Sequence, residues 1–217
     1  MKRVLFFLAA LLNVALISGQ AQTKSSGNYR MIEINPMVGY QFGGRMNFYE
    51  GNFKIYDNLN YGGNLDFILG RRITFELGYT RMDSHGYWQP FPGFEKDYPY
   101  TELDIAVNYF QVGILKEAWM NKVKPFGLFT VGATWFEPKT PSLYDVWQFS
   151  IALGGGVKVF LNDFIGLRFQ GRLLLPMYFT GVGFYFGSGG SGITVSSSTV
   201  FVQGDFSGGL IFALGKR

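Results

Sequence analysis

The single histidine of the chain, His85, is the first residue to test for catalysis, because imidazole is the commonest general base near neutral pH. It follows Asp83 and Ser84, so the triplet holds the residue types of a serine hydrolase. Neighbouring residues rarely point their functional atoms at one another, and we place the triplet at a loop tip without an oxyanion hole. We therefore predict no enzyme and no cofactor, and a lone histidine without further ligands predicts no metal site.

A second group of residues suited to binding lies in the segment 87–94. It sets Tyr87, Trp88, Phe91 and Phe94 around two prolines, in what we expect to be a long outer loop. Aromatic rings held in this way offer flat, stiff surface that stacks on sugars or anchors a protein partner. The alternative is that the rings cap the fold or rest among lipopolysaccharide headgroups.

The elements that position these groups are strands with a two-residue period. In residues 147–159 every odd residue is large and apolar or glycine, whereas every even one is polar or small. This alternation predicts a strand with one oily face and one polar, narrow face. Eight segments show the same period: 32–42, 59–69, 73–80, 103–114, 129–135, 147–159, 165–175 and 200–214.

The fourth of these segments changes parity. Leu103, Ile105, Val107 and Tyr109 begin its oily face, and Phe110, Val112 and Ile114 continue it at even positions. A β-bulge near Tyr109 would bring both sets to the same face, so we expect one there.

The connections alternate between short and long. Those near 70–72, 117–122 and 161–163 are short, whereas those at 43–57, 83–100, 137–145 and 187–198 are long. Short turns on one side and long loops on the other are typical of an up-and-down transmembrane barrel.

A soluble eight-stranded barrel is the main alternative, since its strands alternate as well. Its polar face would normally carry many Lys and Glu residues, but here that face is mostly Asn, Gln, Ser, Thr, Gly and Ala. Aromatic residues gather on the oily face near the loop-bearing ends, as in a membrane-interface girdle: Tyr40, Phe42, Tyr61, Tyr79, Trp135 and Trp147. The prediction is an all-β, eight-stranded, antiparallel, up-and-down transmembrane β-barrel.

Composition and the first residues fit an exported protein. Charged residues make up 16% of the 217 residues, against roughly 25% in typical soluble domains, and there is no cysteine. Lys2 and Arg3 precede an apolar run and the small residues Ser18 to Ala21, which predicts a cleaved signal peptide at 1–21 and a barrel at 22–217. Without those two residues the formal net charge falls from +4 to +2, which is too small to favour nucleic-acid binding.

The chain resembles the small eight-stranded outer-membrane barrels of Gram-negative bacteria, of the OmpX, OmpA membrane-domain and opacity-protein type. The resemblance is strongest over 149–172 and in the closing strand, where Ser207, Gly209, Phe212 and Leu214 match the spacing of the signal for the barrel-assembly machinery. The tail at 215–217 departs from it, since many members end on an aromatic residue. An even number of strands leaves both termini on the short-turn, periplasmic side. The resemblance implies an outer-membrane location with contact to lipid and lipopolysaccharide, and no periplasmic domain is expected after the barrel.

With the oily faces outward, nine charged residues are expected to line the lumen: Glu33, Asp66, Glu76, Glu102, Asp104, Lys158, Arg168, Arg172 and Asp205. Buried charges are costly unless paired, which favours an ion-pair core that fills the barrel. The leading function is then a structural or surface-interaction role through the extracellular loops, with a sugar or a protein as external ligand. The alternative is a small channel for ions or hydrophobic molecules, of the OmpW or porin type.

Overall fold

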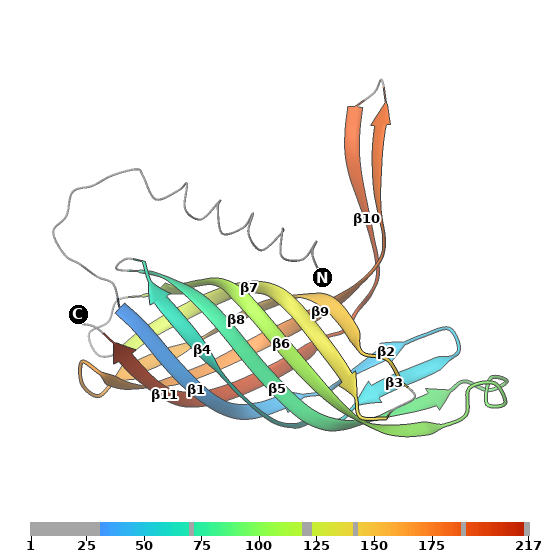
Figure 1. Ribbon diagram of the computed structural model, residues 1–217, viewed down its shortest axis with the longest axis horizontal. Coiled ribbons are helices and arrows are strands. Elements are labelled where there is room, and N and C mark those ends of the chain that lie inside the picture. Colours follow the sequence, from blue (N-terminus) through green and yellow to red (C-terminus); the bar gives the residue numbers. More distant parts are fainter. Residues whose placement is uncertain (1–30, 70–71, 119–122, 141–142, 188–189, 215–217) are drawn as a thin grey trace.

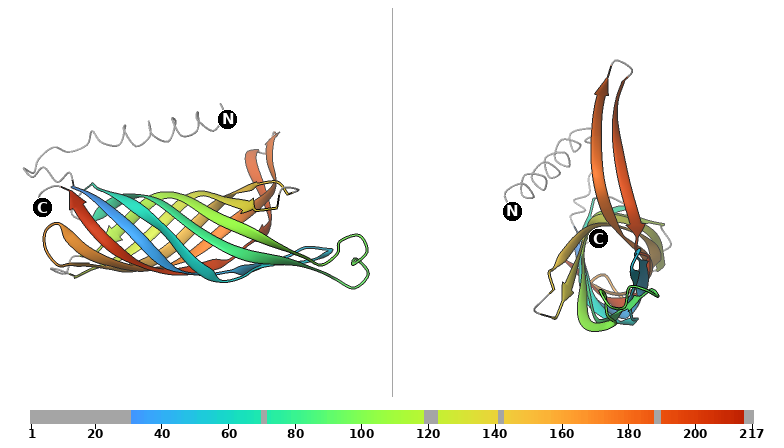
Figure 2. Two further views of the ribbon diagram at one scale, coloured as in Figure 1. Left: turned by 60° about the horizontal axis from the view of Figure 1, so that its bottom comes forward. Right: turned by 90° about the vertical axis from the view of Figure 1, so that its right-hand side faces the viewer.

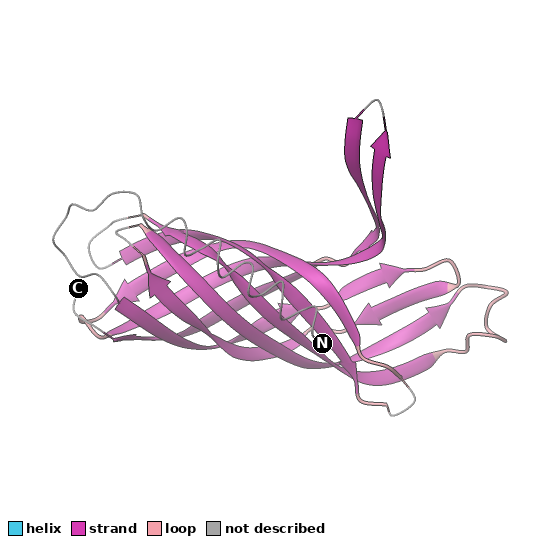
Figure 3. Ribbon diagram, turned by 45° about the horizontal axis from the view of Figure 1, so that its top comes forward, coloured by secondary structure: helices cyan, strands magenta, loops and turns pink. Residues whose placement is uncertain are grey.

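The computed structural model describes residues 31–69, 72–118, 123–140, 143–187 and 190–214, with the side chains of residue 31 and residues 178–200 left aside. This part of the chain is built of eleven strands (Figures 1 and 3). Eight form the wall of a barrel: β1 Met31–Phe42, β4 Asn58–Ile68, β5 Ile73–Pro90, β6 Thr101–Glu117, β7 Val123–Pro138, β8 Val146–Phe160, β9 Ile165–Gly187 and β11 Gln203–Leu214. No described helix has the length and apolar character needed to cross a membrane. The predicted signal peptide at 1–21 and the tail at 215–217 lie outside the described residues.

The eight wall strands close into a ring in which each strand runs antiparallel to its two neighbours. Following the chain, β4 pairs with β5, β5 with β6, β6 with β7, β7 with β8 and β8 with β9. Strand β11 pairs with β9 and with β1, and β1 pairs with β4, which closes the ring (Figure 2). The predicted eight-stranded antiparallel up-and-down barrel is therefore confirmed.

The two ends of the barrel differ as predicted, but the long connections are mostly strand rather than loop. Strands β2 Gly44–Asn47 and β3 Gly51–Ile55 form a hairpin whose second strand pairs with β5. Strands β5 and β6 stay paired up to Trp88 and Thr101, and β9 continues into a hairpin with β10 Gly190–Val200 that stands away from the barrel (Figure 1). Pairing continues because these segments still offer backbone N–H and C=O groups to a neighbouring edge.

The outer wall is apolar along the barrel. Val38 is 69% exposed and Phe206 is 65% exposed, and large side chains on every wall strand are exposed with them. A soluble monomer rarely exposes so continuous an apolar surface, whereas a lipid bilayer covers it.

An aromatic band borders this wall on the loop-bearing side. Trp135 and Trp147 stack with ring centroids 5.3 Å apart, and Phe110 and Tyr79 extend the row across β6 and β5. Tyr40, Phe42 and Tyr61 are also exposed. The positions predicted for an interfacial girdle thus lie on the outer face.

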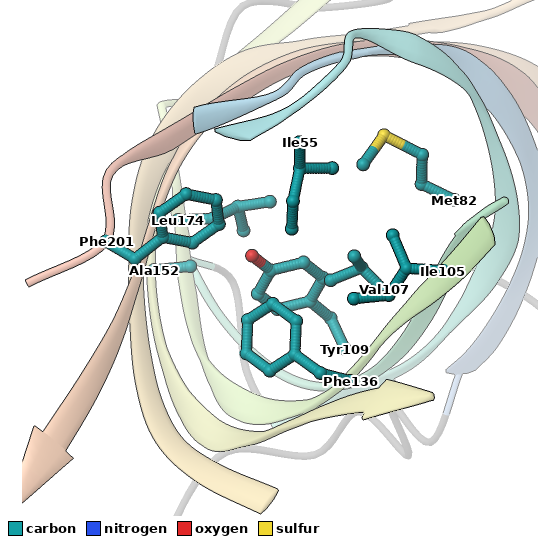
Figure 4. Close-up of a cluster of buried hydrophobic side chains, with 9 residues drawn as sticks. All are labelled: Ile55, Met82, Ile105, Val107, Tyr109, Phe136, Ala152, Leu174 and Phe201. Atoms are coloured by element: carbon teal, nitrogen blue, oxygen red, sulfur yellow. The ribbon is translucent and has the colours of Figure 1, made fainter. Parts of the chain in front are cut away.

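The predicted β-bulge near Tyr109 is wrong. The register of β6 against both neighbours runs through this position without a shift. Ile105, Val107 and Tyr109 are instead buried inside the barrel, while Phe110 and Ile114 face outward. The strand needs no bulge because the interior beside β6 is apolar at the loop-bearing end and accepts these side chains (Figure 4).

Candidate functional site

Near the short-turn end, the barrel interior is filled by an ionic cluster centred on Lys158. The ammonium group of Lys158 on β8 lies 2.7 Å from Glu33 Oε2, 2.8 Å from Asp66 Oδ2 and 3.0 Å from Glu117 Oε1. These carboxylates come from β1, β4 and β6, so one cation joins four strands around the ring. The sequence prediction left out Glu117 because it placed this residue in a turn, although the alternation of β6 continues to it.

Arg168 on β9 continues the cluster across the lumen. Its guanidinium lies 3.2 Å from Asp66 Oδ2 and 2.6 Å from Glu76 Oε2, and it donates to Gln170 Oε1 at 2.6 and 2.9 Å. It also stacks 4.8 Å from the centre of the Phe126 ring. Arg168 and Lys158 are both fully buried, so their charges are balanced by these contacts and not by bulk water.

A second polar layer lies further toward the loop-bearing end. Arg172 contacts Asp205 at 2.5 and 3.0 Å and donates to Thr80 Oγ1 at 2.9 Å, and Asn60 donates to Asp205 at 3.1 Å. Above it, Gln41 bonds to Gln203, which also accepts the hydroxyl of Tyr109. The middle of the lumen is therefore crossed by hydrogen bonds from wall to wall.

Two interior glycines make room for this filling. A Cβ on Gly154 would lie 3.0 Å from the side chain of Arg172, and a Cβ on Gly156 would lie 2.7 Å from the Phe126 ring. The small residues of the alternating β8 stripe therefore accommodate the large ones that cross the lumen.

Seven of the nine charged residues assigned to the lumen are buried there, but Glu102 and Asp104 are not. Both are exposed, on the outer face of β6 beyond the aromatic band. The predicted bulge had reversed the faces of this part of β6, and without it the even positions face out. Here Glu102 accepts a 2.5 Å hydrogen bond from Tyr100, which raises the pKa of Tyr100 to about 12 because the bond favours the protonated phenol.

His85 also differs from its predicted place. It lies in β5 opposite Asp104, which its Nδ1 contacts, and not at a loop tip. Ser84 faces the interior and donates to the backbone oxygen of Tyr56, whereas His85 faces outward. Successive strand residues point to opposite faces, so His85 cannot activate its neighbour as a nucleophile.

The four aromatic residues proposed for interaction do not form one surface, because they point to different faces. Tyr87 and Trp88 belong to β5, not to a loop: Tyr87 packs on Tyr56 and Tyr100, and Trp88 turns to the other face toward Phe48. Phe91 is 39% exposed after the strand ends, and Phe94 packs edge-on against Tyr49.

The loop-bearing end of the interior is a hollow lined by apolar side chains, which we call the vestibule. Its volume is about 630 Å³. The described residues that line it are Met46, Phe48, Phe53, Trp88, Leu103, Ile105, Phe136, Pro138, Leu143, Tyr144, Val146, Gln148 and Phe201. Beneath it packs a buried cluster that includes Ile55, Met82 and Tyr109 (Figure 4). Sequence analysis missed the vestibule because it assigned every large apolar side chain of β6 to the lipid face.

A closed eight-stranded barrel with an apolar wall and a filled ionic interior defines the outer-membrane β-barrel fold. The crystal structure of Neisserial surface protein A has the same fold. It is 12% identical to this chain, with a TM-score of 0.51, and the match covers 84% of this chain and 96% of that one. The sequence-based resemblance to small outer-membrane barrels is thus confirmed at the level of the fold.

Other solved barrels match with lower TM-scores. The attachment invasion locus protein Ail of Yersinia pestis, solved with the heparin analogue sucrose octasulfate, is 9% identical with a TM-score of 0.46 over 84% of this chain and 99% of that one. The N-terminal barrel of Pseudomonas aeruginosa OprF is 11% identical with a TM-score of 0.41 over 83% and 97%. No protein-family model and no curated protein matches the chain.

Proposed function

We propose that this protein is a non-enzymatic barrel of the bacterial outer membrane that acts through its extracellular end while its lumen stays closed. The observation that carries the proposal is the ionic cluster of Lys158 and Arg168, which joins β8 and β9 to acidic residues of β1, β4, β5 and β6 across the whole lumen. Opening a path would require removing buried charges from their partners, which costs about 3–5 kcal/mol for a pair.

The same architecture supports an orientation in the membrane. Met31 and Leu214, the first and last described strand residues, lie at the short-turn end of the barrel. The beginning of β1 pairs with the end of β11 and also with the end of β4, which precedes the short connection to β5. In outer-membrane barrels short turns are periplasmic and long connections are extracellular. We therefore place both termini in the periplasm and the aromatic band among lipopolysaccharide headgroups. The strands that extend beyond this band, namely the β2–β3 hairpin, the paired ends of β5 and β6 and the β9–β10 hairpin, are called the ribbons, and we place them outside the cell. Assembly would proceed through the barrel-assembly machinery, for which the outward Phe212 and Leu214 of β11 supply part of the signal.

Recording single channels in planar bilayers tests the closed lumen. We expect the wild-type barrel to give no reproducible conductance steps, because the ionic cluster leaves no continuous water path. Steps whose size changes in Arg168→Ala, but not in Lys139→Ala on the barrel exterior, would instead establish the alternative of a small ion channel.

A surface role is tested separately at the ribbons. Cells that display the barrel would be compared for adherence to immobilised glycans and host-type surfaces, with Trp88→Ala and Phe91→Ala as variants. A binding profile that neither substitution changes would contradict a role of these aromatic residues in the interaction.

A further inference from the structure

The vestibule has the features of a binding site for an apolar small molecule. Its volume of about 630 Å³ lies within the roughly 300–1,000 Å³ usual for ligand pockets. Aromatic and aliphatic side chains form nearly all of its described lining, and Gln148 adds a single amide. Such walls with few polar groups are typical of sites that bind hydrophobic ligands.

The charge distribution indicates what part of a ligand enters. None of the described lining residues is acidic or basic. A charged group inside would lose its hydration without gaining a counter-ion, so only an uncharged portion is stable there. A charged or polar end would remain at the mouth, in water.

The residues at the bottom of the vestibule determine whether a ligand can continue into the lumen. Below the vestibule Tyr109 is fully buried and donates to Gln203, which also accepts from Gln41. The Arg172–Asp205 pair and the Lys158 cluster follow beneath. An apolar molecule would have to displace these polar contacts to move further, so the vestibule ends blindly.

The outer face of β5 to β7 is charged at the same level. Beyond the aromatic band, Arg81 bonds to Asp83 at 2.6 Å and to Glu137 at 3.2 Å, and Lys139 bonds to Glu137 at 2.9 Å. These charged groups lie outside β5 and the end of β7, so on this side of the barrel a lipid chain would have to cross them to enter sideways. The mouth of the vestibule opens at the ribbon end, which the proposed orientation places outside the cell. We therefore expect the ligand to come from the external medium.

We infer that the vestibule binds the apolar chain of a fatty-acid-like amphiphile, which enters from outside the cell and is held above the closed lumen. This inference rests on the proposed surface function and names its ligand class. Trp88 on β5, Phe136 on β7 and Phe201 before β11 enclose the chain, and the polar end stays at the mouth.

Quenching of tryptophan fluorescence tests the inference in lipid nanodiscs. The probe is ω-bromoundecanoic acid, whose bromine quenches only nearby indoles. Two single-tryptophan forms are compared: one keeps Trp88 in the vestibule, and the other keeps Trp147, which is 58% exposed on the outer wall. We expect saturable quenching of Trp88 that unlabelled undecanoic acid reverses, and only a non-saturable partition effect on Trp147.

A matched pair of substitutions on β6 locates the site. Leu103→Lys places a charge inside the vestibule, whereas Glu102→Lys places the same side chain on the outer face. Leu103→Lys should raise the half-saturating probe concentration at least about tenfold, since a charge facing the buried chain costs more than about 1.4 kcal/mol. Glu102→Lys should change it less than about twofold.

Three outcomes overturn the inference: non-saturable quenching of Trp88, equal effects of the two lysine variants, or quenching of Trp88 that unlabelled undecanoic acid does not reverse. Single-channel recording on the same preparation tests the proposed closed lumen independently of ligand binding. A conducting barrel without Trp88 quenching would refute both statements, and a silent barrel without quenching would refute only the ligand.

Discussion

Removing the Lys158 charge is the most direct test of the ionic interior. At the observed separations of 2.7, 2.8 and 3.0 Å, each attraction is worth about 6 kcal/mol at an effective dielectric constant of about 20. Desolvation of the ions and repulsion among the three carboxylates offset most of this sum. For Lys158→Met, which keeps the stem and removes the ammonium, we expect a loss of about 3–5 kcal/mol because buried acids are left unpaired.

The assay is reversible unfolding of the barrel in lipid vesicles with denaturant, followed by tryptophan fluorescence. Lys139→Met is the matched control, since its pair with Glu137 is solvent-accessible and should contribute no more than about 1 kcal/mol. Adding Asp66→Asn to Lys158→Met should recover part of the loss by removing one orphaned charge. Equal small losses for Lys158→Met and Lys139→Met would refute the idea that this cluster holds the strands together.

Three further predictions use pairs of positions within the chain. Gly156→Ala should destabilise the barrel by about 1–3 kcal/mol in the same unfolding assay, because its Cβ would lie 2.1 Å from the Phe169 oxygen. Gly127→Ala, where nothing lies within 4 Å, should be nearly neutral, and similar effects would contradict the tight interior. Leu153→Lys, midway along β8 between Trp147 of the aromatic band and the short turn after Phe160, should cost about 2–4 kcal/mol in vesicles if the wall faces lipid. Tyr49→Lys, at an 83% exposed ribbon site, should cost no more than about 0.5 kcal/mol, so equal costs would argue against a lipid-facing wall. Glu102→Gln should move the pKa of Tyr100 from about 12 toward 10, measured by carbon-13 tyrosine NMR, because the amide carries no charge to oppose the phenolate; an unchanged value would exclude the bond to Glu102 as its cause.

The stripe from Gln148 to Lys158 shows what could be predicted about the site. Its even positions are small or polar, which is enough to place Lys158 inside a narrow barrel among charges of opposite sign. The choice of partners was not predictable in the same way. Glu33, Asp66 and Glu117 lie far from Lys158 in sequence, and only the register of four strands brings them together.

Strand β6 shows where the reasoning from sequence fails. Ile105 and Val107 are apolar, and an apolar side chain is equally stable against lipid and inside an apolar vestibule. The pattern alone therefore supports either face, and the bulge that seemed to reconcile it with Phe110 reversed Glu102 and Asp104 as well.

The sequence by itself determined the eight wall strands, their up-and-down order and most of the outer wall, because a two-residue period is a local property that each segment carries alone. The tertiary structure decided which apolar residues turn inward, how far the ribbons extend beyond the membrane, and that an apolar vestibule lies above a closed ionic core. These features depend on closure of the ring and on cross-strand register, which join residues far apart in the chain.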